Sequence, residues 1–282
     1  MGKPFGETDW RAMSRAEVDA GLNNGVATPD SADISAGWVK RSEAIKAKYP
    51  DHLDLSYGPA PRNRFDFLKA TEGGPTLLLI HGGYWQMRSK DFFTCFAAGP
   101  MAHGINVAVV GYTLAPEATL DQIVAELHAS VDALVAQLPA LGGDPSRIVV
   151  SGWSAGGHLT ATTLNHPAVK GGVAISGLFD LEPIRHSYLN DKLKLDEAMS
   201  KRQSPLMQDG GPAAPLSIVV GGGELPILRQ QSADLAAFRA QHGLPVSYEE
   251  IPGAHHFSVM AELESPTGRI TTLIKQMVDR IS

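Results

Sequence analysis

Six short apolar runs recur between residues 76 and 251, and longer segments with apolar residues at helical spacing separate them. The runs are residues 76–80, 106–110, 147–150, 172–175, 216–220 and 246–251. The clearest segment between them, residues 120–138, has the apolar spacing of an amphipathic helix. Continuous apolar runs are typical of strands buried on both faces, so the alternation predicts an α/β fold with a mostly parallel sheet and helices on both faces. The last run is more polar and is expected at an edge.

The chain before residue 76 has a different pattern. Residues 1–50 are polar and predict two helical stretches, one beginning at a capping box of Ser14 and Glu17 and one running from about residue 35 to residue 48. Residues 54–57 and 64–69 alternate apolar and polar positions, which predicts half-exposed antiparallel edge strands. The expected division is an N-terminal helical cap segment, residues 1–50, and a main domain, residues 51–282.

Composition narrows the class of protein. With 282 residues, 43% hydrophobic and 19% charged, the chain can bury one large core. The net charge of −6 and the scattered Lys and Arg residues argue against nucleic acid as a partner. Cys95 is the single cysteine, which excludes an internal disulfide and a thiolate metal cluster. No apolar run approaches membrane-spanning length and the start has no signal-peptide pattern, so we expect a cytoplasmic protein that does not bind membranes.

The most informative motif is Gly152-Trp153-Ser154-Ala155-Gly156, directly after the apolar run that ends near residue 150. A strand that leads into G-x-S-x-G and then into a helix is the nucleophile-elbow pattern, in which a sharp turn exposes a serine hydroxyl above a sheet. Glycine is needed where neighbouring chain passes close to that turn. An ordinary glycine-rich turn is the alternative for an isolated match, so the other parts of a catalytic site must also be present.

A serine nucleophile needs a histidine base and an acid that orients it, and parallel sheets gather such groups beyond the carboxyl ends of their strands. After the last strand the chain offers His255 and His256, and because adjacent residues point in different directions only one can reach Ser154. Glu224 is the first carboxylate after the run 216–220. It could also be a solvated carboxylate near a helix start, and Asp180, after the preceding strand, is the fallback.

An oxyanion hole requires backbone N–H groups that face the carbonyl oxygen. The amide of Ala155, directly after the nucleophile, is one expected donor. The loop after the first parallel strand contains His81, Gly82 and Gly83, and its glycines would allow the oxygen to approach closely. We therefore expect Gly82 and Gly83 to supply the second donor.

Several residues beside these motifs have a structural and a functional interpretation. Tyr84, Trp85 and Trp153 could pack in the core or form an apolar wall for a flat substrate group. His81 has no second ligand at metal spacing, so we predict that it fixes the loop through hydrogen bonds and that no metal site is present. His158, one turn after the elbow, is expected to pack the helix.

The chain resembles the α/β hydrolase superfamily and, within it, the arylformamidase (kynurenine formamidase) and related carboxylesterase group. The residues that carry the resemblance are 81–85, 152–156, 175–183 and the pair His256-Phe257. The resemblance implies the α/β-hydrolase fold and hydrolysis of an N-formyl aryl amide such as N-formylkynurenine, with Ser154 as nucleophile and His256 rather than His255 as base. It places the acid at Glu224, where animal relatives usually have aspartate, and that departure keeps Asp180 as a rival.

The hypothesis from the sequence is a cofactor-free serine hydrolase whose catalytic domain, residues 51–282, acts on a small ester or N-formyl aryl amide through an acyl-enzyme. One alternative is an esterase for a larger or xenobiotic ester that uses the same triad, and another is a hydrolase-fold protein that binds without catalysis. The expected partner is a small-molecule substrate. The N-terminal segment could form a lid over the site or the surface of a homodimer.

Overall fold

The computed structural model describes residues 9–208 and 211–281. Its strands are β1 (Leu55–Ser56), β2 (Arg64–Leu68), β3 (Gly74–Ile80), β4 (Asn106–Val110), β5 (Gly143–Trp153), β6 (Val169–Ile175), β7 (Leu216–Gly221) and β8 (Val246–Ile251). They form an eight-stranded sheet in the order β1-β2-β4-β3-β5-β6-β7-β8. β1 and β2 are antiparallel to each other and β2 is antiparallel to β4, whereas all other pairs are parallel. The predicted mostly parallel sheet is confirmed, with β8 at an edge.

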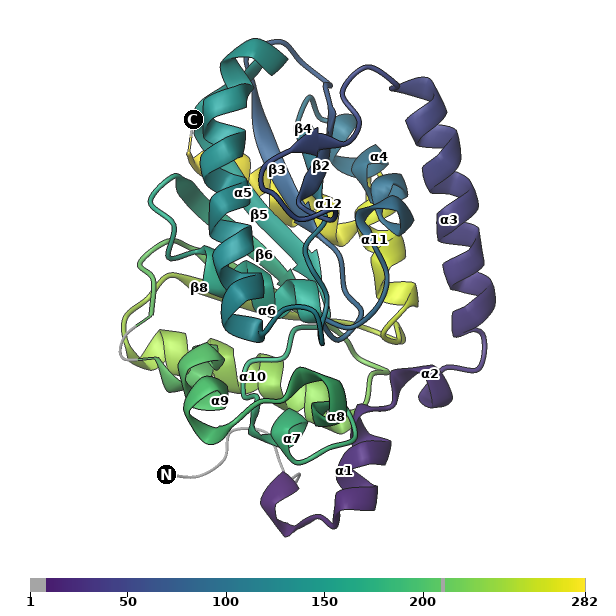
Figure 1. Ribbon diagram of the computed structural model, residues 1–282, viewed down its shortest axis with the longest axis vertical. Coiled ribbons are helices and arrows are strands. Elements are labelled where there is room, and N and C mark those ends of the chain that lie inside the picture. The colour runs from purple at the N-terminus through teal and green to yellow at the C-terminus, as the bar shows by residue number, and fades with distance from the viewer. Residues whose placement is uncertain (1–8, 209–210, 282) are drawn as a thin grey trace.

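Helices cover both faces of this sheet (Figure 1). They are α1 (Arg15–Leu22), α2 (Asn24–Ala27), α3 (Ser31–Lys48), α4 (Ala98–Met101), α5 (Leu120–Leu141), α6 (Ala155–Thr163), α7 (Glu182–Arg185), α8 (Asn190–Leu193), α9 (Glu197–Gln203), α10 (Pro226–Gln241), α11 (Ala261–Glu264) and α12 (Arg269–Arg280). α5 and α6 pack against one face of the sheet, and α4, α11 and α12 against the other. No helix within the described residues is both long and apolar enough to cross a membrane.

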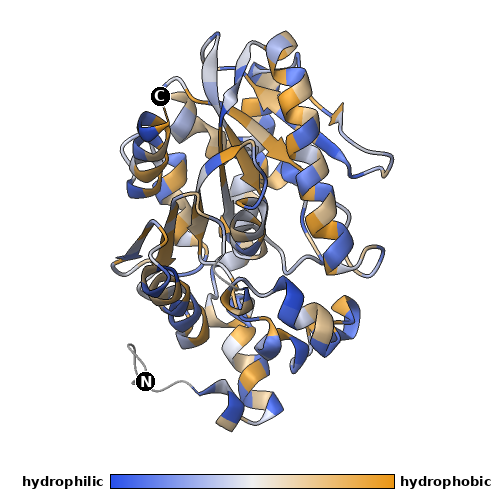
Figure 2. Ribbon diagram, turned by 90° about the vertical axis from the view of Figure 1, so that its left-hand side faces the viewer, coloured by the Kyte–Doolittle hydropathy of each residue, from blue (hydrophilic) through white to orange (hydrophobic). Residues whose placement is uncertain are grey.

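The side chains of β3 show why the apolar runs are continuous. Leu78 and Ile80 join the core cluster on the α5 side, whereas Leu77 and Leu79 join the cluster on the α12 side. All four side chains are fully buried. The sheet therefore lies between two apolar layers, as Figure 2 shows by its hydrophobic strands and its helices of mixed polarity.

Two details differ from the expectation. α3 begins at Ser31, about four residues before the expected start. β2 is not half-exposed, because residues 65–68 are all buried. Its polar position, Asp66, is buried in an ion pair with Lys90, whose Nζ lies 2.6 Å from Asp66 Oδ1. The alternation of polar and apolar residues in β2 predicted that one side of the strand faces solvent, but Lys90 covers Asp66 on that side.

The N-terminal helices pack closely on the rest of the chain. The capping box of Ser14 and Glu17 is present at the start of α1. In α3, the buried indole of Trp38 contacts the rings of Phe93, Phe96, Trp153 and Phe257 at centroid distances of 5.1–6.0 Å. These contacts hold α3 beside the carboxyl ends of the parallel strands.

Candidate active site

Ser154 lies in the sharp turn between β5 and α6, with a positive φ of 59°. A Cβ at Gly152 would lie 2.4 Å from the carbonyl oxygen of Gly156, and one at Gly156 would lie 2.2 Å from that of Ile80. Only glycine fits at either position. The N–H of Ser154 donates to the carbonyl of Ile175 at 2.8 Å, which ties the turn to β6. The backbone thus holds a serine in a strained conformation of the kind found at functional sites.

Glu224 and His256 meet beyond the carboxyl ends of β7 and β8. His256 Nδ1 lies 2.6 Å from Glu224 Oε2, and both side chains are almost completely buried. Because an ionised carboxylate only accepts hydrogen bonds, Nδ1 carries the proton and Nε2 keeps a lone pair. Ser154 and His256 line the same cavity. The geometry therefore fixes one ring nitrogen of His256 on Glu224, with the ring in the lining of the cavity that Ser154 shares.

The other oxygen of Glu224 is also hydrogen-bonded. Oε1 accepts from Ser176 Oγ at 2.5 Å and from the Gly221 N–H at 2.7 Å. A buried carboxylate is costly unless its oxygens are paired, and here both oxygens have donors. The neighbouring Gly223 N–H donates to the carbonyl of Ala254 at 2.8 Å, which ties the loop after β7 to the loop after β8.

The structure brings only one of the two adjacent histidines to Glu224. His255 Nδ1 accepts from the N–H groups of Phe257 and Ser258 at 3.2 Å, and its Nε2 faces Asp30 at 3.7 Å. The ring of His256 instead lies 4.7 Å from that of Trp153, whose Nε1 donates to the His256 carbonyl at 2.7 Å. His255 therefore braces the loop, and His256 faces the cavity.

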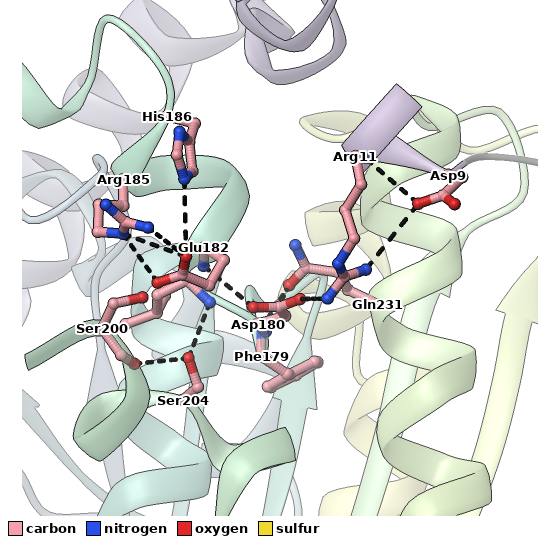
Figure 3. A network of polar contacts seen from close by, with 11 residues as sticks. Asp9, Arg11, Phe179, Asp180, Glu182, Arg185, His186, Ser200, Ser204 and Gln231 are labelled. Carbon is pink, nitrogen blue, oxygen red and sulfur yellow. Dashed lines mark hydrogen bonds and ion pairs between the residues drawn. The ribbon is translucent and has the colours of Figure 1, made fainter. Parts of the chain in front are cut away.

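Asp180 belongs to a separate polar network (Figure 3). Its N–H donates to Gln231 Oε1 at 3.0 Å, its Oδ1 accepts from the Glu182 N–H at 3.0 Å, and its Oδ2 lies 3.9 Å from Arg11 Nη2. Burial raises the pKa of Asp180 above its usual value, while the Glu182 amide and Arg11 oppose that shift. These partners link the loop after β6 to the N-terminal segment, whereas the carboxylate at His256 is that of Glu224.

The loop after β3 and the start of α6 present backbone amides near Ser154 that have no protein acceptor. Gly83 and Tyr84 have positive φ values of 117° and 50°, and Gly83 lines the cavity. Within residues 9–208 and 211–281, the N–H groups of Gly82, Gly83 and Ala155 meet no protein acceptor. Gly82 also lies against Trp153, where a Cβ would come within 2.6 Å of the indole, so only glycine lets the loop pack this closely. All three amides are thus without a competing acceptor, and Gly83 is the one among them that lines the cavity.

A cavity of about 450 Å³ opens over Ser154. Its lining residues are Asn23, Asn24, Gly25, Ser31, Ala32, Ser35, Gly83, Tyr84, Met87, Arg88, Phe92, Trp153, Ser154, Tyr188, His256 and Phe257. Of the three aromatic residues proposed for a pocket wall, Tyr84 and Trp153 line it. Trp85 is fully buried elsewhere, with its ring 5.0 Å from that of His158 in edge-to-face contact.

His81 and His158 are buried packing residues. His81 Nδ1 lies 2.8 Å from the Gly82 carbonyl oxygen, and its ring stacks on Tyr112 at 4.2 Å. His158 Nε2 lies 2.7 Å from the Gln203 carbonyl oxygen. Burial lowers the pKa of His81 to about 3 and that of His158 to about 4, so both rings are neutral at pH 7. In the described part of the chain, no cluster of three His, Cys, Asp or Glu side chains is placed to hold a metal ion.

Comparison with known proteins shows the family of this chain. The sequence profile of the alpha/beta hydrolase fold matches residues 77–260. The chain belongs to the alpha/beta hydrolase family. It is 28% identical to a kynurenine formamidase of Danio rerio, covering 97% of this chain and 99% of that one. It is 30% identical to a kynurenine formamidase of Salmo salar, covering 81% and 82% of the two chains.

Solved structures agree as well. A crystal structure from Silicibacter sp. TM1040 has a TM-score of 0.83 and 30% identity, and it covers 92% of this hydrolase and 99% of that chain. An esterase from Pyrobaculum calidifontis, 18% identical, has a TM-score of 0.73 over 96% of this chain and 95% of its own, which shows the shared fold. The protein is therefore a hydrolase, and its relatives include kynurenine formamidases.

The sequence left several residues of this hydrolase unidentified. Ser176 follows β6 directly, and the rule that working groups follow parallel strands could have singled it out. Arg88 lies in the loop after β3 but eight residues beyond the strand's end, and no signal in the sequence placed it in the cavity. The same is true of the polar residues that the N-terminal segment contributes, which are Asn23, Asn24, Ser31 and Ser35.

Proposed function

We propose that Ser154, His256 and Glu224 form the catalytic triad of this hydrolase and that its substrate is an N-formyl aryl amide or a small ester. The observation that carries the proposal is the 2.6 Å hydrogen bond between His256 Nδ1 and Glu224 Oε2, next to the cavity that Ser154 and His256 share. The order Ser154, Glu224, His256 along the chain is that of the family.

The chemistry follows the acyl-enzyme route. Ser154 Oγ attacks the carbonyl carbon while its proton passes to His256 Nε2. The carbonyl oxygen becomes an oxyanion facing the N–H groups of Gly83 and Ala155, each worth roughly 3 kcal/mol of barrier. The imidazolium, stabilised by Glu224, then protonates the leaving amine or alcohol. Water attacks the acyl-serine, gives its proton to His256 and releases the acid, and Ser154 regains its proton.

The cavity supports a small aromatic substrate. Its volume of about 450 Å³ lies within the usual range of small-molecule sites. Trp153, Phe92 and Phe257 supply flat apolar walls next to Ser154. The relatives named kynurenine formamidase point to N-formylkynurenine as the first substrate to test.

Hydrolysis rates decide between the substrate classes. We expect kcat/KM for N-formylkynurenine to equal or exceed that for p-nitrophenyl acetate and p-nitrophenyl hexanoate, because an aromatic formamide fills the ring-lined cavity. The measurement is a side-by-side steady-state comparison of the three compounds. Rapid ester hydrolysis with negligible formamide turnover would assign the protein to the esterases, and a preference for hexanoate would favour a larger ester. If none of the three compounds were hydrolysed, a non-catalytic protein would be favoured.

We further propose that residues 1–50 act as a cap that helps to select the substrate. Its described part, from residue 9, contributes six of the cavity's lining residues, among them Ala32 in α3. Tyr84 fixes this part to the catalytic domain, because its hydroxyl donates to the Leu22 carbonyl at 2.5 Å and accepts from Asn24 Nδ2 at 2.9 Å. A homodimer that uses the same surface and a cytoplasmic location stay predictions.

The cap proposal is tested with two substitutions on α3. Ala32→Phe is expected to lower the ratio of hexanoate to acetate hydrolysis on the order of tenfold, because the ring enters the cavity. Ala36→Phe, one turn later on the same helix and outside the cavity lining, is the matched control. An altered oligomer mass by light scattering with an unaltered ester ratio would instead make α3 a dimer surface.

A further inference from the structure

Arg88 is the permanently charged side chain among the described residues that line the cavity. The other lining residues are neutral apart from His256, whose charge depends on its protonation. The catalytic cavity therefore carries a fixed positive charge that the proposed chemistry at Ser154 does not use.

The guanidinium of Arg88 has no carboxylate partner. Among the described residues, no Asp or Glu oxygen lies within 4.0 Å of it, whereas Arg41 and Arg269 each pair with a glutamate. Its polar contacts are those of Nη1 and Nη2 with Ser35 Oγ, at 3.2 and 3.3 Å. A guanidinium has five N–H donors, so most remain free for a ligand.

Aromatic rings hold this cation in place. Its Cζ lies 5.6 Å from the ring centroid of Trp38, 5.4 Å from that of Trp153 and 5.6 Å from that of Phe257. Cation–π contacts offset part of the cost of removing the charge from water. Burial still lowers the pKa of Arg88. The backbone of Arg88 is also in the left-handed region, with φ of 74°, which an arginine rarely adopts.

We propose that Arg88 is a specificity-determining residue that binds a carboxylate on the non-reacting part of the substrate. This inference rests on the proposed function, since it concerns the same cavity. A carboxylate matches the planar fork of a guanidinium and can accept two parallel hydrogen bonds from it. It would also supply the counter-charge that the cavity lacks.

The position of Arg88 fits a ligand that reaches from the nucleophile to the cap. The indole of Trp153 contacts both the His256 ring and the guanidinium, and all three line the same cavity, so the base and the cation share one aromatic wall. N-formylkynurenine carries its formamide and its amino-acid side chain on adjacent ring carbons, and a carboxylate ends that side chain. An aryl group held along the wall would place the carbonyl at Ser154 and the carboxylate at Arg88.

The test is a pair of binding measurements on Ser154→Ala protein, which keeps the ligand intact. We expect calorimetry to show that N-formylkynurenine binds tenfold to a hundredfold more tightly than its carboxamide, as a charge-assisted hydrogen bond implies. In Ser154→Ala/Arg88→Met the preference should disappear, and Arg88→Lys should retain part of it. Arg41→Met, which removes the α3 ion pair with Glu264 outside the cavity lining, is the control that should keep the preference in full.

Two results would overturn the inference. The first is equal affinity of Ser154→Ala protein for N-formylkynurenine and its carboxamide. This result would overturn the inference even if the Arg88→Met variant did not fold. A preference that survives in folded Arg88→Met would show that Arg88 only fastens α3 through Ser35 and Trp38. The proposed function is judged separately by turnover in wild-type protein: hydrolysis without a carboxylate preference leaves it standing, whereas a preference without hydrolysis removes it and keeps the anion site.

Discussion

Ser154→Ala is expected to lower kcat on the order of a million-fold, as loss of the nucleophile does in other serine hydrolases. The substitution removes Oγ alone. It keeps the Cβ, the φ of 59° and the hydrogen bond from the Ser154 N–H to Ile175, so the turn and the fold should persist. The measurement is kcat with p-nitrophenyl acetate and N-formylkynurenine, together with a thermal unfolding curve.

Ser151→Ala is the matched control for that result. Ser151 lies in β5, three residues before Ser154, and its buried hydroxyl donates to the Val173 carbonyl at 2.7 Å. Its loss should cost roughly 1 kcal/mol of stability, as the loss of one hydrogen bond does, with little effect on kcat. Retention of more than a small fraction of the rate by Ser154→Ala would contradict the proposed mechanism.

Glu224→Gln is expected to lower kcat on the order of 10⁴-fold, as the equivalent change does in a related triad. The amide can no longer stabilise an imidazolium, and when its NH₂ group faces Nδ1 it forces the proton onto Nε2, the atom that must accept from Ser154. Asp180→Asn should change kcat by less than about tenfold, because the Asp180 carboxylate accepts from the Glu182 N–H and faces Arg11, whereas the carboxylate at His256 is that of Glu224. The two variants are compared by kcat in the same assay.

The same comparison distinguishes a loss of catalysis from a loss of folding. Glu224→Gln leaves Ser176 Oγ and the Gly221 N–H with an oxygen acceptor, so the protein should still fold cooperatively. A large loss of kcat in Asp180→Asn with near-normal activity in Glu224→Gln would make Asp180 the functional acid and refute the assignment.

The sequence predicted the parts of this hydrolase that follow strands. Ser154, Glu224 and His256 lie after β5, β7 and β8, and parallel strands bring their carboxyl ends to one edge of the sheet. The pattern could not separate His255 from His256, since that choice depends on how the loop after β8 turns. The side-chain hydrogen bonds of both residues distinguish them in the structure.

Other features escaped the sequence because they depend on contacts between distant segments. The polarity of Asp66 predicted exposure, but Lys90, 24 residues later, covers it. The sequence around Trp38 did not predict its contacts with the rings of Phe93 and Phe257, which lie in the loops after β3 and β8. Arg88 lies in the cavity because the loop after β3 has positive φ values at residues 83–85 and 88, and no periodic pattern in the sequence predicts such values. Local patterns predict elements, whereas these positions follow from how the elements pack.

A double-variant cycle shows whether Ser154 and Glu224 act as one catalytic unit. The measurement is kcat for wild type, Ser154→Ala, Glu224→Gln and the double variant in one assay. Members of a triad are strongly non-additive, so the double variant should stay within about tenfold of Ser154→Ala. A further loss close to that of Glu224→Gln alone would show that the two residues act independently, which a catalytic triad does not allow.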